Sequence, residues 1–114
     1  MGASAEYVEY IKELFGGFPD LNTKKYFGGV AFRSSYFGTD IQFGVVLGDV
    51  LYFVVDDKTR PKYEEKNMKP FSYDKKDKVV IVKKWYAAPG ELFDDEALMQ
   101  EWAMEALEVA VRSK

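Results

Sequence analysis

The sequence predicts an α+β domain with an N-terminal helix, an antiparallel sheet of at least four strands interrupted by a short helix, and a long C-terminal helix. Three observations predict this class. Apolar residues recur at helical spacing near the two ends of the chain, whereas strand-like alternation and turn signals fill the middle. The 114 residues, 47% hydrophobic and 17% aromatic, suffice for one core. We therefore assign residues 1–114 to a single domain.

The first helix is expected to begin after Ser4, whose hydroxyl can accept a hydrogen bond from a free backbone amide of the first turn. Apolar side chains then recur at helical spacing, at Tyr7, Val8, Ile11, Leu14 and Phe15. The pair Gly16-Gly17 predicts the end of the helix.

Two regions predict the first half of the sheet. Tyr26 to Arg33 is interpreted as one strand, with Gly28-Gly29 inside it as a bulge or a point of close backbone approach. Further on, Ile41 to Leu47 and Val50 to Val55 flank Gly48-Asp49, which predicts a tight hairpin. The second hairpin strand is apolar on both faces, so we expect it to be central and covered by a helix.

A short helix and the rest of the sheet are expected next. Asp56-Asp57 or Thr59 can cap a helix that runs to about Lys66, with Pro61 tolerated in its first turn. The remaining signals predict an extended piece, a charged turn and a β-rich run, at Phe71 to Tyr73, Asp74 to Lys78 and Val79 to Ala87.

The last segment predicts the longest helix. We expect Asp94 to cap it, with Arg112 near its negative end. One apolar stripe follows the helical rows, at Leu98, Met99, Trp102, Ala103, Ala106, Leu107 and Ala110.

The composition argues against most catalytic machinery. Cysteine and histidine are both absent, which removes thiolate nucleophiles, histidine bases and nearly every zinc site. The carboxylate pairs Asp56-Asp57 and Asp94-Asp95 remain, and both stand where helix caps are expected. We therefore expect no enzyme, no metal and no cofactor, and keep a small metal-dependent carboxylate enzyme as the third alternative.

The charge is uneven, although the net value is only −3. Residues 58–84 hold ten Lys or Arg against four Asp or Glu, whereas both flanking segments are acidic. This segment therefore contains the candidate contacts for a partner or for nucleic acid, which are Lys75, Lys76, Lys78, Lys83, Lys84 and Tyr86. Lysines on an edge strand also protect it from aggregation, and we expect Trp85 in the core.

The location expected from the sequence is the cytoplasm. Charged residues interrupt the segment from Met1 to Phe15, where a signal peptide needs an apolar run. The longest apolar stretch, Val50 to Val55, is far shorter than the roughly 20 residues of a membrane span. We expect no membrane contact, and an exposed strand edge could pair two copies.

Several short motifs occur together in a characteristic order. They are Lys25-Tyr26-Phe27-Gly28-Gly29-Val30-Ala31-Phe32, Phe43-Gly44-Val45-Val46, Asp49-Val50-Leu51-Tyr52, Val55-Asp56, Arg60-Pro61, Pro70-Phe71-Ser72-Tyr73, Trp85-Tyr86-Ala87-Ala88-Pro89, Asp94-Asp95, Trp102-Ala103 and Ala106-Leu107. In order and spacing this set resembles the N-terminal domain of the TfoX/Sxy competence-regulator family, over nearly the whole chain.

The resemblance implies a secretion-chaperone-like α+β architecture and a role in positive regulation of competence genes alongside a cyclic-AMP receptor protein. It implies no catalytic residues, and a protein partner in the transcription machinery or a regulator. Full-length members carry a second, helical domain, so the chain looks like a stand-alone N-terminal module. Family-motif residues expected to be structural are Phe27, Gly28, Gly29, Tyr52, Asp56 and Trp102. The leading hypothesis is a regulatory interaction module, and direct nucleic-acid binding through Lys75 to Lys84 is the alternative.

Overall fold

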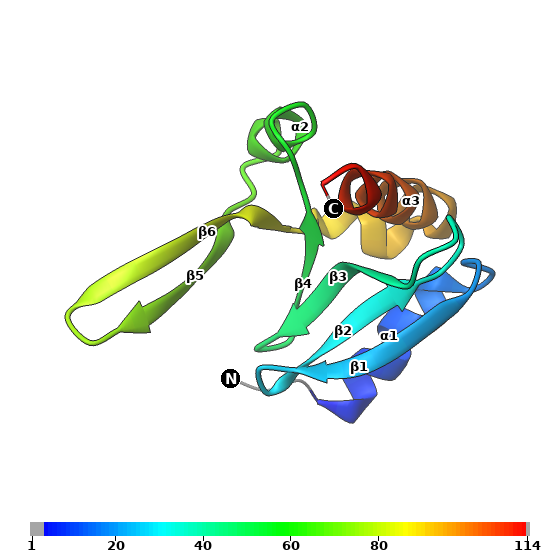
Figure 1. The fold of residues 1–114 in the computed structure, drawn as a ribbon, viewed down its shortest axis with the longest axis horizontal. Helices are drawn as coiled ribbons and strands as arrows, with labels where there is room; N and C mark the ends of the chain where they lie inside the picture. The colour runs from blue at the N-terminus through cyan, green and yellow to red at the C-terminus, as the bar shows by residue number, and fades with distance from the viewer. Residues whose placement is uncertain (1–3, 114) are drawn as a thin grey trace.

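Helices α1 (Ala5–Phe15) and α3 (Glu96–Arg112) lie against one face of a six-stranded antiparallel sheet in a computed structural model that describes residues 4–113 (Figure 1). The remaining elements are β1 (Leu21–Tyr26), β2 (Gly29–Ser34), β3 (Ile41–Leu47), β4 (Val50–Val54), α2 (Arg60–Glu65), β5 (Pro70–Lys75), β6 (Lys78–Ala87) and the 3₁₀ helix η1 (Gly90–Asp94). The predicted α+β class is confirmed, with an N-terminal helix, an antiparallel sheet interrupted by a short helix, and a long C-terminal helix.

The strand order is β1-β2-β3-β4-β6-β5, and every neighbouring pair is antiparallel. Strand β4 is central, as its two-sided apolar pattern predicts, and α3 packs against both β3 and β4. Phe15, Phe32, Phe43 and Phe53 form an aromatic cluster in the core between helices and sheet.

The hairpin of β3 and β4 is confirmed. Leu47 pairs with Val50, and Gly48 and Asp49 form the turn with φ values of 58° and 56°. Two consecutive positive φ values are typical of a type I′ turn, whose twist matches that of the strands it joins.

The prediction of one continuous strand from Tyr26 to Arg33 is wrong, although the close backbone approach expected at Gly28-Gly29 is confirmed at Gly29. Tyr26 instead pairs with Gly29 across a second tight turn, in which Phe27 and Gly28 have φ values of 46° and 81°. Glycine supplies the positive φ of a turn as readily as it relieves crowding at a bulge, so the Gly-Gly signal allowed both readings. The preceding strand β1 is mostly exposed and polar, and shows no apolar alternation.

The first helix and the stripe of the last helix are confirmed. Ser4 Oγ accepts a hydrogen bond from the Tyr7 amide at 3.2 Å. The cap of α3 differs from the prediction by one residue, because Asp95 Oδ1 accepts from the Leu98 amide at 3.0 Å. Asp94 is the last residue of η1, a 3₁₀ helix that was not predicted.

The hairpin of β5 and β6 projects away from the rest of the sheet, at the left of Figure 1. We call residues 70–82 the arm. Its two-residue turn, Lys76-Asp77, is shorter than the charged turn predicted over residues 74–78. An irregularity in the pairing between Pro70 and Phe71 marks the place where the arm leaves the sheet.

No helix within residues 4–113 has both the length and the apolar character needed to cross a membrane.

Candidate interaction surface

A cavity of about 420 Å³ lies between the arm and the body of the sheet. We call it the arm groove. From the arm and the adjoining part of β6 it is lined by Phe71, Tyr73, Val82, Lys84 and Trp85. Trp85 is buried, as predicted, so a core side chain forms part of the lining.

The body of the molecule supplies the opposite wall of the arm groove. Val45 and Leu47 of β3 are both buried, and Tyr26 and Phe27 come from the end of β1 and its turn. Among residues 4–113, Lys84 is therefore the only charged residue in a lining that is otherwise aliphatic and aromatic. Cavities of this size and apolar character are typical of binding sites.

Phe27 combines two unfavourable features at the rim of the arm groove. Its side chain is 82% exposed, and its φ of 46° lies in the left-handed region. That region costs an ordinary side chain roughly 1 kcal/mol or more, and bulky residues rarely adopt it. Its ring meets the ring of Tyr26 edge to face, with centroids 4.7 Å apart. A strained and exposed aromatic residue is characteristic of functional sites.

Gly29 fixes the position of the turn that presents Phe27. A β-carbon at this position would collide with the carbonyl oxygen of Val46, since β2 and β3 approach closely there. The family-motif residues Gly28 and Gly29 therefore have structural reasons of their own: Gly28 supplies a positive φ, and Gly29 supplies space.

The arm exposes apolar side chains outside the groove as well. Val79 and Ile81, which alternate with Val80 and Val82 along β6, are 60% and 56% exposed. The sequence prediction treated residues 79–87 only as a sheet strand and missed this exposed face. Apolar residues at consecutive positions beside a lysine-rich turn were the available signal.

The predicted lysines all lie at the surface, in two groups. Lys75, Lys76 and Lys78 surround the turn at the tip of the arm, and Lys83 and Lys84 lie near its base. Within residues 4–113 none of the five forms an ion pair. Their charges are therefore available to a partner.

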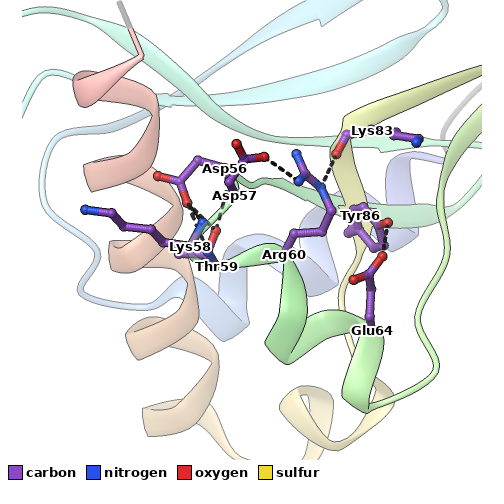
Figure 2. A network of polar contacts seen from close by, with 8 residues as sticks. All are labelled: Asp56, Asp57, Lys58, Thr59, Arg60, Glu64, Lys83 and Tyr86. Atoms are coloured by element: carbon purple, nitrogen blue, oxygen red, sulfur yellow. Dashed lines mark hydrogen bonds and ion pairs between the residues drawn. The ribbon is translucent and has the colours of Figure 1, made fainter.

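Tyr86 is separated from these lysines. It is buried, and its hydroxyl donates a hydrogen bond to Glu64 Oε2 at 2.8 Å (Figure 2). Burial, and then the bond to Glu64, raise the pKa of Tyr86 above its usual value. The ring packs against Tyr63 at 6.1 Å, inside the core, where a stacking base or a partner would not reach it.

Asp56 and Asp57 have separate structural partners (Figure 2). Asp56 Oδ1 accepts from the amides of Lys58 and Thr59 at 3.0 Å each, which orders the turn before α2. Asp57 instead pairs with Arg60, which also donates to the Lys83 carbonyl. Thr59, the residue before α2, makes no side-chain capping bond to the helix.

Asp56 also holds the end of α3. Arg112 Nη2 donates to Asp56 Oδ2 at 2.9 Å, linking the last turn of α3 to the loop after β4. This bond lowers the pKa of Asp56 to about 2, and the hydroxyl and amide of Thr59 contribute further. No group of three or more acidic residues within residues 4–113 is placed to hold a metal ion.

Tyr52 and Trp102, the remaining family-motif residues, have packing roles. The Tyr52 ring meets Phe71 edge to face at 5.3 Å and so supports a wall of the arm groove. Trp102 is buried on α3, 4.8 Å from the ring of Tyr63, and Lys62 Nζ lies 4.0 Å from its ring centre. These contacts fix α2 against α3.

The sequence profile of the TfoX N-terminal domain matches residues 13–110, which is nearly the whole chain. No curated protein matches the chain.

Proposed function

Because the chain belongs to the TfoX N-terminal domain family, we propose that it is a non-catalytic interaction module that regulates transcription through protein contacts. The observation that carries the proposal is the arm groove, whose apolar lining includes the strained and exposed Phe27. An open apolar surface of this kind marks an interaction site more often than a solvated face.

The arm itself supports a binding role. A two-stranded hairpin is marginally stable in water by itself, and this one exposes Val79 and Ile81. A protein that only needed a stable fold would gain nothing from such exposure. Contact with a partner would bury these side chains and stabilise the arm.

The family resemblance directs the proposal towards competence genes. In that reading the module acts in the cytoplasm, alongside a cyclic-AMP receptor protein or the transcription machinery. These partners are proposed by analogy within the family. A shared fold does not by itself carry a shared function, so they need a test in the cell.

A strain comparison tests the proposed function. Transcript profiles are measured in the source organism with the intact gene, without the gene, and with Phe27→Asp or Phe37→Asp. Phe37 is a matched control because it is also an exposed aromatic residue, 46% exposed, but lies beyond the opposite end of β2, outside the arm groove.

We expect loss of the gene to change a defined set of transcripts, and Phe27→Asp to reproduce most of that change. Phe37→Asp should keep the profile of the intact gene. Identical profiles with and without the gene would exclude a role in transcription.

Direct nucleic-acid binding is a second candidate, favoured by the five exposed lysines that form no ion pair within the described residues. Fluorescence anisotropy with labelled duplex and single-stranded DNA at two salt concentrations tests it. Each phosphate contact should add about −0.9 to the slope of log affinity against log salt on duplex DNA. The double variant Lys83→Glu, Lys84→Glu should then remove the binding, and a slope near zero would exclude this candidate.

A further inference from the structure

We propose that the arm groove binds an acidic peptide segment of a partner protein, with a leucine or aromatic side chain in the groove and carboxylates against the surrounding lysines. This inference rests on the proposed function and names the chemistry of the partner. It is carried by the shape and lining of the groove, by the sign of the surrounding charge, and by the conformation of Phe27.

The lining selects an apolar anchor. The walls formed by Val45, Leu47 and Val82 are aliphatic, and Phe71 adds an aromatic surface. A volume of about 420 Å³ accommodates one or two large side chains rather than a folded element. In interfaces between proteins, such pockets take the few anchor residues that contribute most of the binding energy.

The charge around the groove selects carboxylates. Lys84 lies in the lining, and Lys75 follows Tyr73 by two residues on β5, so that Lys75 projects from the same face of the strand as Tyr73. Both lysines are exposed, and no carboxylate from residues 4–113 contributes to the lining. A peptide with Asp or Glu beside its apolar anchor would complement this pattern, whereas a basic peptide would be repelled.

Phe27 can contact the anchor directly. Its ring belongs to the lining of the groove, its backbone is held in an unfavourable conformation, and the ring of Tyr26 packs against it. Much of this exposed ring would become buried when a peptide side chain enters the groove and packs against it. Binding would then recover apolar area that the free domain leaves in water.

Two other occupants of the groove, single-stranded nucleic acid and a second copy of this chain, fit less well. Single-stranded nucleic acid binds along grooves that supply several cations for its phosphates, whereas the described lining holds one cation, Lys84, and its aromatic rings share a cavity with Val45, Leu47 and Val82. If the arm of a second copy entered the groove, its tip would bring Lys75, Lys76 and Lys78 and so add positive charge beside Lys84, which is unfavourable. Both remain outcomes of the test.

The test begins with selection from a library of random short peptides displayed on phage, using the intact domain and counter-selecting against Phe27→Asp. Enriched peptides should combine leucine or aromatic residues with Asp and Glu. A labelled synthetic copy of the most enriched peptide is then titrated by fluorescence anisotropy. Lys84→Glu should weaken its binding by about tenfold, since a contacting charge is reversed, and Lys12→Glu on α1 serves as the control.

Exchanging the charges of the peptide and the domain provides the decisive experiment. A peptide with its acidic residues replaced by lysine should fail on the intact domain and regain affinity for Lys84→Glu. Enrichment of basic or uncharged peptides, or no enrichment, would overturn the inference. So would displacement of the peptide by single-stranded DNA at lower concentration, or concentration-dependent dimerisation that blocks peptide binding.

Failure here is distinguishable from failure of the proposed function. If no acidic peptide is selected but Phe27→Asp still changes the transcript profile and Phe37→Asp does not, the groove acts in regulation with a different occupant. If the profile never changes, the proposed function fails, whatever the peptides do.

Discussion

Three consecutive residues at the turn before β2 meet three different physical requirements. They are Phe27, Gly28 and Gly29. Gly28 provides a positive φ, Gly29 leaves room for the carbonyl of Val46, and Phe27 adopts an unfavourable φ while its ring lines the arm groove. Of the three residues, Phe27 is the one whose side chain is not required by the geometry of the turn. We therefore expect substitutions in this turn to separate stability from binding.

Gly29→Ala is predicted to lower the free energy of unfolding by roughly 1 to 3 kcal/mol, because the added methyl meets backbone rather than a movable side chain. Gly17→Ala is the matched control, since a β-carbon there has no neighbour within 4 Å. Urea unfolding of both variants checks the prediction. Equal losses at the two positions would mean that β2 and β3 can separate without cost.

Phe27→Asn is predicted to raise the free energy of unfolding by several tenths of a kcal/mol to about 1 kcal/mol. Asparagine adopts a positive φ more easily than phenylalanine, and Asn-Gly is the preferred pair for this turn. The same change should weaken binding of a partner, because the ring at the rim of the groove is lost. Thermal unfolding together with peptide titration checks both effects, and a destabilised variant would contradict the assigned strain.

Two aspartates in the loops before α2 and α3 connect these helices to the rest of the fold. Asp95 begins α3, and Asp56 organises the turn before α2 while receiving Arg112 from the far end of α3. Each of these two aspartates stands next to a second aspartate in the sequence, Asp94 or Asp57, and in both cases the neighbour has a different role. These structural roles account for the presence of the two aspartate pairs without a catalytic role.

Asp95→Ala is predicted to cost about 1 kcal/mol of stability, because the Leu98 amide loses its acceptor. Asp94→Ala should change stability by less than about half of that, since no bond from its side chain to α3 is seen. Chemical unfolding of the two variants checks the assignment. A larger loss of stability for Asp94→Ala than for Asp95→Ala would mean that Asp94 caps the helix, as the sequence predicts.

Asp56 is predicted to make stability depend on pH in the acidic range. Its pKa is near 2 in the folded protein, below the ordinary value of 3.8, so the ionised form stabilises the fold at neutral pH. That contribution should be complete above about pH 4 and disappear as the pH falls towards about 2. Asp56→Asn should therefore cost about 1 kcal/mol at pH 7 and almost nothing at pH 2. A loss that does not vary with pH would contradict the bond to Arg112.

At the scale of the whole molecule, the sequence predicts elements that carry local signals. Ser4 and the stripe of α3 define the helices, and Gly48-Asp49 defines the central hairpin. Strand β1 was missed because it is an exposed edge strand whose residues need no apolar face. The 3₁₀ helix η1 carried no distinctive pattern of its own.

The candidate site was only partly predictable. The lysines of the arm were expected at the surface and lie there, whereas Tyr86, adjacent to Trp85 in the sequence, turns into the core. The arm groove joins side chains from β1, β3, β5 and β6, which are neighbours only after the sheet has formed. No spacing in the sequence could reveal a cavity assembled in that way.

The most direct measurement is photo-crosslinking in living cells, with benzoylphenylalanine in place of Phe27 in one strain and Phe37 in another. The account predicts discrete protein crosslinks from position 27, which is at the rim of the arm groove, and none of them from position 37. The same products from both positions, no product from position 27, or crosslinks to nucleic acid alone would contradict it.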